Sequence, residues 1–392
     1  MAKLGEVCDI LNGYAFKSNQ YTTSGVRIIR ISNVQKGYIE DKSPVYYPCD
    51  DENVKKYELK QNDLLISLTG NVGRTALLEE KFLPAALNQR VSCVRLKEPD
   101  KVLKTYLFHL LNSDYFEQQC MKAAEGVAQK NLSPKWLFEY KIPMYSIERQ
   151  KEISNTLDKI DLLIILRKQQ LAKLDELVKA RFVEMFGDSV ANTKNFPSTT
   201  LETVMTVFPQ NGLYKPQTDY VQDDTGIPIL RIDAFYNGKV TNWNTLKRLI
   251  CSETEIDRYL LKENDIVINR VNSIEYLGKC AHIVGLKEKT VFESNMMRFH
   301  MDEKKVNAVY VTEVLCTEDI YRQILRRAKK SVNQASINQE DVKSLEILVP
   351  PLSLQNQFAA FVERVDQQKQ TIQQSLEKLE LMKKALMQEY FG

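Results

Sequence analysis

The sequence is poor in the residues on which metal centres and nucleophilic catalysis most often depend. It holds three histidines, His109, His282 and His300, and none of them has a metal-ligand or catalytic-triad partner at a recognisable spacing. The seven cysteines are scattered, odd in number and form no C-x-x-C pair, a pattern typical of reduced thiols in a cytoplasmic protein. These shortages count against a metal centre and against a disulfide-stapled scaffold.

Signatures of membrane insertion, export and cofactor binding are missing as well. No apolar run approaches the roughly 18–20 residues that a membrane helix needs, and the N-terminal segment has no signal-peptide core or cleavage site. There is no G-x-x-x-x-G-K-[ST] loop, no G-x-G-x-x-G after a strand and no (Asn/Asp)-Pro-Pro-(Tyr/Phe) loop of the kind that amino-methyltransferases use. We therefore expect a cytoplasmic chain with no membrane contact, no metal, no cofactor of its own and no catalytic residues.

What the sequence does have is material for several cores. Its 392 residues, 43% of them hydrophobic, suit two to three domains rather than one. The net charge of +3 is mild, so it permits an anionic partner without demanding one.

The second half of the sequence repeats the first. Sliding the chain on itself by 205 residues lays residues 347–392 on 142–187 without a gap, as far as an identical ending at Phe186-Gly187 and Phe391-Gly392. A generic helical pattern could reproduce the leucines and lysines of this segment, but it would not keep register to the same terminator. A unit near 200 residues is also too long for a solenoid repeat, so the pattern predicts a duplicated domain.

The repeat extends upstream with small shifts in offset. "GVRIIRI" at 25–31 matches "GIPILRI" at 226–232, and "LKQNDLLIS" at 59–67 matches "LKENDIVIN" at 261–269. We therefore predict the order globular domain, helix, globular domain, helix, with limits at 1–141, 142–188, 189–346 and 347–392.

Each helical segment carries a seam of apolar residues. These positions step alternately by four and three residues over more than four heptads, which is the a/d pattern of a coiled coil. The seam residues are Ile153, Leu157, Ile160, Ile164, Leu171 and Leu174 in the first helix and Phe358, Val362, Val365, Ile372, Leu376 and Leu379 in the second. Two matching stripes in one chain predict that the helices pair as an antiparallel coiled coil with the globular domains at its opposite ends, although each stripe could instead dock on its own domain.

Four cations interrupt the two seams. They are Arg167 and Arg181 in the first helix and Lys369 and Lys383 in the second. Burying four unpaired cations would be costly, so we expect them to reach acidic partners or to lay their stems along the seam with the charge in water.

The globular halves have the pattern of mixed α/β domains. Short strands are predicted at 26–32, 63–68 and 91–96, and again at 227–233, 265–269 and 296–301, with one helical stretch after each set, at 105–124 and 309–328. We therefore predict an α+β fold with two tandem mixed α/β domains, mostly antiparallel sheets, a long helix after each domain and a pseudo-two-fold relation between the halves.

Polar loops recur at four equivalent places in the two halves. The first follows an Asn-Gly pair, at 12–21 and 211–220, and the second follows the matched strand, at 69–75 and 269–279. The third is a turn that repeats the order Asn then Arg, at 88–93 and 294–299, and the fourth is a basic segment past the helical stretch, at 126–136 and 326–337. Arg and Lys can pair with guanine, Asn and Gln with adenine, and Lys or Ser with phosphate. Taken singly, each loop is ordinary solvated surface, but their recurrence favours a shared DNA-binding face. The predicted DNA contacts are Lys17, Arg74, Arg90, Lys130 and Lys135 in the first half and Lys215, Arg270, Arg298, Lys329 and Lys330 in the second.

The entrances to the two helices are also alike, "IPMYSIERQKEI" and "VPPLSLQNQF". Together with the domain–helix–domain–helix plan, the matched strand motifs and the paired Phe-Gly endings, they make the chain resemble the specificity subunit of type I restriction–modification enzymes over essentially its whole length. The resemblance implies two target recognition domains, each reading one half of a bipartite site on double-stranded DNA. It also implies that the helix pair acts as a ruler for the unspecified gap between the half-sites.

The resemblance further implies the partners of such a subunit. Two modification (methyltransferase) subunits would dock on the helix pair and use S-adenosylmethionine to methylate adenine, and restriction and motor subunits would join for cleavage. The chain itself would be a specificity subunit without catalytic activity.

Two other classes of function stay open at this point. A coiled-coil adaptor or scaffold with duplicated protein-binding domains would fit the same repeat, and it would show no salt-dependent affinity for DNA. A self-contained methyltransferase or nuclease is disfavoured by the missing motifs, and an assay of the isolated chain would distinguish it.

Overall fold

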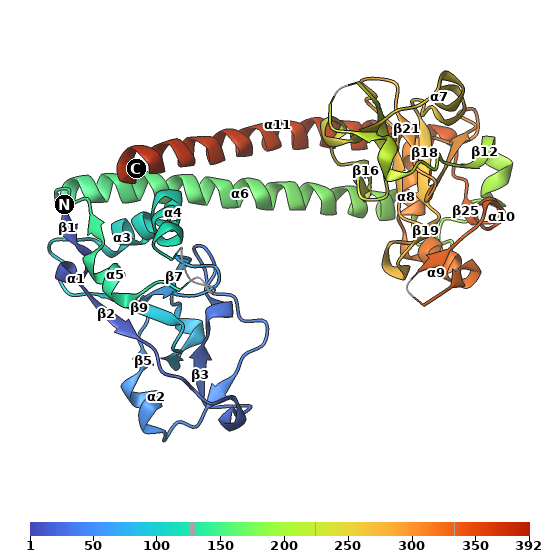
Figure 1. Ribbon diagram of the computed structural model, residues 1–392. Coiled ribbons are helices and arrows are strands. Elements are labelled where there is room, and N and C mark those ends of the chain that lie inside the picture. Colours follow the sequence, from blue (N-terminus) through green and yellow to red (C-terminus); the bar gives the residue numbers. More distant parts are fainter. Residues whose placement is uncertain (125–130, 224, 333) are drawn as a thin grey trace. The chain divides into compact units, whose positions relative to one another are not determined.

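The computed structural model describes residues 1–124, 131–223, 225–332 and 334–392. Its internal contacts divide the chain into two compact units: unit 1 holds Met1–Gln170 with Ile372–Gly392, and unit 2 holds Leu171–Thr371. Two helices, α6 (Ile147–Phe186) and α11 (Leu352–Phe391), contribute residues to both units (Figure 1). Each helix lies inside the segment predicted for it, while the predicted domain limits themselves stay a prediction.

Unit 1 contains the first globular domain. Its elements before α6 are β1 (Ala2–Lys3), α1 (Leu4–Val7), β2 (Cys8–Asn12), β3 (Val26–Ile29), β4 (Tyr46–Tyr47), α2 (Glu52–Lys56), β5 (Glu58–Leu59), β6 (Leu64–Ser67), β7 (Thr75–Leu77), β8 (Ala85–Leu87), β9 (Val91–Leu96), α3 (Lys104–Leu111), α4 (Asp114–Ala123), α5 (Pro134–Glu139) and β10 (Lys141–Ile142). The strands form three sheets with the orders β2-β9-β6-β7, β4-β3-β8-β5 and β1-β10. Helices α3 and α4 lie beside α6 (Figure 1).

Unit 2 contains the second globular domain. Its elements between the long helices are β11 (Ser198–Thr200), β12 (Met205–Asn211), β13 (Tyr220–Val221), β14 (Ile227–Leu230), β15 (Phe235–Tyr236), β16 (Gly238–Val240), β17 (Lys247–Leu249), α7 (Glu253–Tyr259), β18 (Asp265–Asn269), β19 (Val271–Asn272), β20 (Cys280–His282), β21 (Val291–Phe292), β22 (Met296–Met301), α8 (Ala308–Leu315), α9 (Glu318–Arg327), β23 (Lys329–Lys330), β24 (Ala335–Ser336), α10 (Gln339–Lys343) and β25 (Glu346–Leu348). The sheets are β12-β22-β18-β20-β16-β15, β13-β17-β14-β21, β19-β24-β23 and β11-β25.

The two domains repeat one scheme of strand pairing. The order β2-β9-β6-β7 corresponds to β12-β22-β18-β20, and β4-β3-β8 corresponds to β17-β14-β21 with its parallel pair in the same place. The turns before β6 and β18 even share a left-handed asparagine, because Asn62 and Asn264 both have a φ of 66°. The predicted α+β class and the internal repeat are thus confirmed, and the strands of the described residues pair antiparallel apart from β3–β8, β14–β21 and β16–β20.

The helical stretch predicted in each domain as one piece is two helices instead. The first stretch divides into α3 and α4, and the second into α8 and α9. At each break a hydroxyl caps the next helix, since Ser113 accepts from the Phe116 N–H and Thr317 from the Ile320 N–H. Ser and Thr compete with the helical backbone for hydrogen bonds, which is why the apolar pattern alone did not reveal the break.

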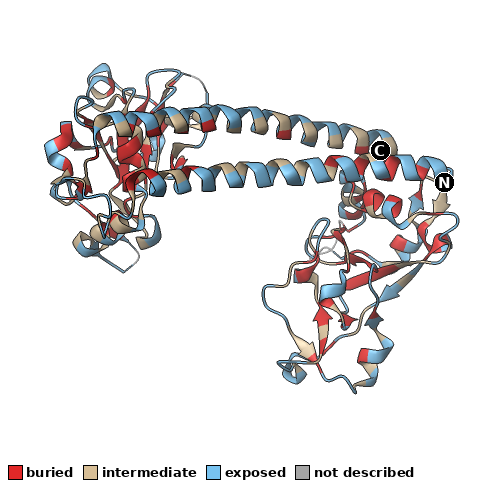
Figure 2. Cartoon of the chain, turned by 180° about the vertical axis from the view of Figure 1, so that it is seen from behind, coloured by how far each residue is buried: buried red, intermediate tan, exposed pale blue. Residues whose placement is uncertain are grey.

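The predicted seam is the buried side of the long helices. In unit 1 Ile153, Leu157 and Ile160 of α6 are at most 4% exposed, and in unit 2 Phe358, Val362 and Val365 of α11 are at most 5% exposed. Figure 2 shows buried and half-buried positions recurring between exposed ones along both helices. Ile164, Leu171, Leu174, Ile372 and Leu379 are half-buried and Leu376 is buried. The assignment of all these residues to a helix–helix seam stays a prediction.

Within each unit the two helices run antiparallel. In unit 1 Asp161 pairs with Lys383 and Lys168 with Glu380, so rising numbers in α6 meet falling numbers in α11. In unit 2 Asp175 pairs with Lys369, and the Arg181 guanidinium lies 5.9 Å from the centre of the Phe361 ring. The second-helix cations thus reach acidic partners, as expected. Arg167 and Arg181 instead donate to Gln170 and Glu184 on their own helix.

The ends of the stripes join the domain cores, so helix pairing and docking on a domain both occur. Ile153 and Phe391 belong to the main core of unit 1, and Phe186 and Phe358 belong to that of unit 2. The repeated Phe-Gly ending has the same place in both units. Phe391 packs on Tyr106 with ring centres 5.5 Å apart, and Phe186 packs on Tyr310 at 4.7 Å.

Candidate nucleic-acid interface

In the first domain the recurring loops converge on one residue, Leu68, just past the end of β6. The Leu68 N–H donates to the Arg90 carbonyl at 3.0 Å, and the Leu68 carbonyl accepts from the Leu132 N–H at 2.7 Å. The preceding Ser67 N–H donates to the Arg74 carbonyl at 2.9 Å. The loop after the matched strand, the Asn-Arg turn and the segment past the helical stretch therefore meet at one point.

The second domain repeats this junction at Arg270, just past the end of β18. The Arg270 N–H donates to the Asn295 carbonyl at 2.9 Å, and the Arg270 carbonyl accepts from the Ile337 N–H at 2.9 Å. Asn269, the equivalent of Ser67, donates its N–H to the Lys279 carbonyl at 2.8 Å. The same backbone frame thus carries Leu at its centre in one domain and Arg in the other.

The chain after each Asn-Gly pair joins the junction as well. Gln89 donates its N–H to the Tyr14 carbonyl at 2.9 Å, and Ser294 donates to the Leu213 carbonyl at 2.9 Å. The glycines permit this approach, because a Cβ at Gly13 would lie 2.0 Å from the Asn88 carbonyl oxygen and one at Gly212 would lie 2.2 Å from that of Glu293. All four loop types predicted from the sequence therefore come together in both domains.

Four of the five predicted first-domain contacts can be placed in the structure. Arg74 and Arg90 flank the junction, and their side chains are half-buried and exposed, respectively. The Arg74 guanidinium donates to the Gln35 side-chain oxygen at 2.6 Å. Lys17 and Lys135 are exposed, three residues beyond Tyr14 and Leu132 respectively, while Lys130 lies outside the described residues.

In the second domain three predicted cations lie in or directly beside a small sheet. Lys329 and Lys330 are exposed on β23 of the sheet β19-β24-β23, and Arg270 directly precedes β19. Lys215 is held apart from them, because its ammonium lies 2.9 Å from Glu255 and 3.5 Å from Asp219 and is 17% exposed. The hydrogen bond to Glu255 raises the pKa of Lys215, so the side chain stays charged.

Arg298 has an internal partner. Its guanidinium lies 3.2 Å from the carboxylate of the fully buried Asp265 and is 12% exposed. In the first domain the equivalent aspartate, Asp63, pairs with Arg95, but the strand register aligns Arg95 with His300 and Cys93 with Arg298. The buried aspartate is thus the repeated feature, and its pairing with Arg298 belongs to the second domain alone. This position gives no support to Arg298 as a DNA contact, so we leave it out of the proposed interface, and its DNA role stays an untested prediction.

A broad concave basin opens beside the second junction. Its volume is about 990 Å³. Ser294 and Asn295 line it next to aromatic and basic residues, among them Tyr214, which is 78% exposed, and Lys287. Among the residues that the structure describes, the lining has five basic and three acidic side chains (Lys215, Arg231, Lys247, Arg248 and Lys287 with Asp223, Glu288 and Glu293). Mixed polar, basic and aromatic walls suit recognition of nucleic acid better than binding of an apolar ligand.

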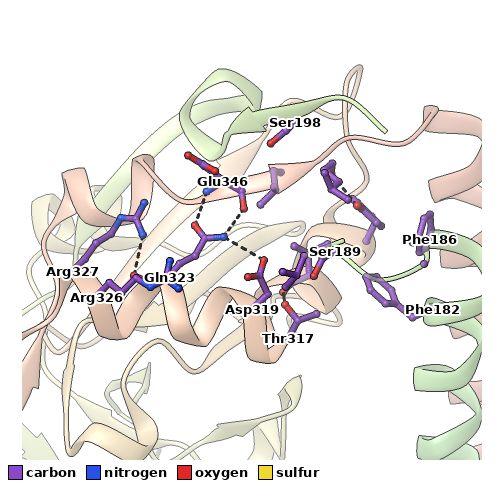
Figure 3. Close-up of a pocket in the computed structure, with 16 residues that line it drawn as sticks. Phe182, Phe186, Ser189, Ser198, Thr317, Asp319, Gln323, Arg326, Arg327 and Glu346 are labelled. Atoms are coloured by element: carbon purple, nitrogen blue, oxygen red, sulfur yellow. Dashed lines mark hydrogen bonds between the residues drawn. The ribbon is translucent and has the colours of Figure 1, made fainter. Parts of the chain in front are cut away.

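A second, smaller cavity in unit 2 has no such character. It measures about 280 Å³ and lies beside Phe182 and Phe186 at the end of α6 (Figure 3). Its polar wall is internally bonded, because the Gln323 side chain donates to the Glu346 carbonyl at 3.0 Å and accepts from the Glu346 N–H at 2.9 Å. These hydrogen bonds hold α9 to β25, so the polar groups that make them are already engaged with one another.

The three histidines all have structural partners. His109 bonds Asp158 at 2.8 Å, His282 bonds Asn264 at 3.1 Å and His300 bonds Asp265 at 2.9 Å. Among the described residues no three His, Cys, Asp or Glu side chains gather as a possible metal site. In the described parts of the chain, no helix is both apolar enough and long enough to span a membrane.

The structure also corrects the register of the repeated turn. The sequence aligned Asn88 and Arg90 with Asn295 and Arg298, but the hydrogen bonds align Asn88 with Glu293 and Arg90 with Asn295. Sequence reasoning therefore did not single out Gln89, Ser294 and Asn295, which lie in this turn. The sequence did hold a signal for the correct alignment, because the 205-residue offset between the long helices also aligns residues 88–90 with residues 293–295.

Comparison with known proteins points to one family. The sequence model described as "Type I restriction modification DNA specificity domain" matches residues 1–176 and 196–381. The chain is 23% identical over 392 residues to the type I restriction enzyme EcoKI specificity subunit of Escherichia coli (strain K12), covering 94% of this chain and 81% of that protein. It is 32% identical over 186 residues to the type I restriction enzyme MjaVIII specificity subunit of Methanocaldococcus jannaschii, covering 46% of this chain and 43% of that one.

The fold agrees with that likeness. The crystal structure of the S subunit of a type I restriction-modification system from M. genitalium matches all of this chain and 95% of its own with a TM-score of 0.59 at 14% identity. Two matched segments that cover nearly the whole chain decide the assignment: this chain belongs to the family of type I restriction modification DNA specificity domains.

Proposed function

We propose that this chain is the specificity subunit of a type I restriction–modification complex and reads a bipartite site on double-stranded DNA, one half-site per domain. One observation carries the proposal: the junction at Leu68 recurs at Arg270 with the same hydrogen bonds and different side chains. A shared frame with divergent loops is what two readers of two different short sequences need.

The chemistry of the loops supports a division of labour on DNA. Exposed Lys17, Lys135, Lys329 and Lys330 suit phosphate contacts, which fix orientation without reading sequence. Arg and amide side chains at the junction suit base edges in the major groove. Two such readers in one chain would engage two half-sites of one duplex.

The long helices supply the surface for the other subunits of the complex. Leu162, Leu163, Ile165 and Leu166 of α6 are 42–55% exposed although they are large and apolar. An exposed apolar patch on a paired helix suits docking of another protein. We assign it to the modification subunits, which use S-adenosylmethionine to methylate the DNA, with restriction and motor subunits joining the same complex.

The chain itself acts without catalysis in this proposal. The support is that each histidine is engaged by a neighbouring side chain and that the larger basin is built for recognition. Catalysis and the cofactor then belong to the partner subunits.

The test begins with the purified chain, alone and with its modification subunit. With the subunit it should bind a bipartite duplex with an affinity that falls as salt rises, by about 0.9 in the logarithmic slope for each phosphate contact. Alone it should neither transfer a labelled methyl group from S-adenosylmethionine nor cut DNA. Methyl transfer by the pure chain would contradict the non-catalytic role, and salt-independent or absent DNA binding would favour an adaptor.

A companion experiment tests the docking surface. Ile165→Glu places a charge in the exposed apolar patch and should weaken co-purification with the modification subunit. Lys159→Glu, on the exposed surface of the same helix, is the control for added charge. Equal retention of the modification subunit by both variants would move the docking site elsewhere.

A further inference from the structure

One short turn holds the same backbone position in both domains and differs at all three side chains. It joins β8 to β9 as Asn88-Gln89-Arg90 and β21 to β22 as Glu293-Ser294-Asn295. Within the turn, Val91 donates its N–H to the Asn88 carbonyl at 3.0 Å, and Met296 donates to the Glu293 carbonyl at 3.1 Å.

The framework fixes this turn from both sides. On one side its middle residue is bonded to the chain after the Asn-Gly pair, at Tyr14 or Leu213. On the other side its last residue accepts from the junction residue, Leu68 or Arg270. Backbone atoms make all of these hydrogen bonds. The side chains of the last two residues of the turn can therefore vary without breaking them.

Those side chains face solvent or the basin. Gln89 and Arg90 are exposed, and Ser294 and Asn295 are half-buried and line the basin of the second domain. Glu293 differs, because it is buried and its carboxylate accepts the Ile232 N–H at 2.5 Å. Its carboxylate is engaged by this bond and positions the turn.

We propose that this turn is the main base-reading element of each domain, with Gln89 and Arg90 reading the first half-site and Ser294 and Asn295 reading the second. The proposal rests on the proposed function and adds the residues that decide specificity. A pre-set turn costs little conformational entropy on binding, which suits a reader that must discriminate between bases.

The side chains predict which bases are read. The Arg90 guanidinium presents two parallel donors, which match O6 and N7 of guanine, and the amides of Gln89 and Asn295 match the donor and acceptor of adenine. Ser294 accepts several bases, so it contributes little discrimination. Arg270 supports the second turn, because its guanidinium donates to the Ser294 carbonyl at 3.2 Å.

The experiment selects duplexes from a pool with both half-sites randomised, using the full chain in complex with its modification subunit. In Arg90→Ala one guanine position of the first half-site should lose about 5- to 150-fold of its preference, which corresponds to about 1–3 kcal/mol at about 1.4 kcal/mol per factor of ten. The second half-site should not change. Asn295→Ala should relax one adenine of the second half-site only.

Two further variants sharpen the reading. Lys104→Ala removes a positive charge from the exposed start of α3 and should keep every base preference. The double change Gln89→Ser with Arg90→Asn gives the first turn the reading side chains of the second, and should convert the guanine preference to adenine without touching the other half-site.

The outcomes separate the two proposals. If Arg90→Ala and Asn295→Ala melt like the unmodified chain and keep all base preferences, or lose affinity equally for all sequences, the turn does not read bases. If the unmodified complex itself selects no sequence, the proposed function fails instead.

Discussion

Two glutamines at equivalent positions hold the start of each long helix to its own domain. Gln150 accepts from the Leu103 N–H at 2.8 Å and donates to the Lys101 carbonyl at 2.9 Å. Gln355 accepts from the Asn307 N–H at 2.9 Å and donates to the Pro350 carbonyl at 2.8 Å. Both side chains are fully buried, so each amide satisfies backbone groups that water cannot reach.

Replacing Gln355 by Leu should destabilise unit 2. The change leaves the Asn307 N–H without its acceptor at a half-buried position, which costs about 1–3 kcal/mol. The measurement is the urea midpoint together with hydrogen exchange at the Asn307 amide. Gln357→Leu, at an exposed position of the same helix, is the matched control. Equal midpoints for the two variants would show that the buried amide contributes nothing.

His282 should make the stability of unit 2 depend on pH. Burial lowers the pKa of His282 to about 4, whereas Glu263 and Glu303 act weakly in the opposite direction. The unfolded chain, with an ordinary histidine pKa of about 6.5, therefore binds more protons between these values. Stability from this group is present above about pH 6.5 and is lost as the pH falls toward 4.

A His282→Gln variant should remove that dependence. Glutamine can still donate to Asn264 but does not titrate, so the variant's urea midpoint should fall less between pH 7 and pH 4.5 than that of the unmodified chain. His109, whose pKa is also lowered mainly by burial, remains in both proteins and serves as a common background. Parallel pH curves for the two proteins would refute this assignment.

At the scale of elements, ion pairs join the long helices. Asp161 and Asp175 of α6 pair with Lys383 and Lys369 of α11, and Lys168 of α6 pairs in the opposite sense with Glu380 of α11. Each pair joins residues from the two different helices inside one unit. The pattern therefore favours α6 against α11 in this register over a slipped pairing.

Reversing one charge should weaken the pair and reversing both should restore it. Asp161→Lys places two lysines together and should lower the free energy of unfolding by about 0.5–1 kcal/mol, since both side chains are about one third exposed. Adding Lys383→Asp should recover most of the loss. A thermal-melting cycle of the four proteins measures the coupling, and additive effects would mean that the two side chains do not interact.

Some features of these elements could be predicted from the sequence and others could not. The two seams, from Ile153 to Leu174 and from Phe358 to Leu379, could be recognised because a 3.5-residue period is a local property of the chain. The division at Ser113 and Thr317 was not predicted, since a capping hydroxyl does not alter the apolar pattern. The pairing of Arg298 with Asp265 was also missed, because it joins neighbouring strands 33 residues apart.

The candidate interface shows the same limit. The four loop types could be recognised from their recurrence, and Arg74, Arg90 and Arg270 were named from it. Their meeting at Leu68 and Arg270 depends on strand order, which local patterns do not encode. The register of the turn at 88–90 against 293–295 depends on backbone hydrogen bonds, so residue order alone gave a shifted alignment.

At the scale of the whole molecule, the expected role of the helix pair in setting the gap between the half-sites can be tested. Four residues inserted after Lys168 and four after Ser375 would lengthen facing parts of α6 and α11 together by about 6 Å. An insertion of four shifts the heptad phase by about half a residue, so the seam survives with local unwinding. At about 3.4 Å per base pair, the gap between half-sites should grow by one to two base pairs.

The measurement is the methylated motif of a host that carries the altered chain with its modification subunit. Both half-sites should stay the same, because no reading loop changes. Replacing Lys168 by Ala without insertion is the control for damage to the helix surface. An unchanged gap with full activity would mean that these helices do not set the spacing.

Unit 1 is built from two stretches of chain that are far apart in synthesis. Its last part, Ile372–Gly392, follows residue 170 by about 200 residues, which take roughly 10–40 s to make at about 5–20 residues per second. During that interval the core around Tyr106 and the apolar face of α6 is incomplete, because Phe391 and Met387 have not yet been synthesised. If translation stops early, the first domain therefore keeps an exposed apolar surface, a feature that chaperones and proteases recognise. Only a chain translated through Phe391 can hide it.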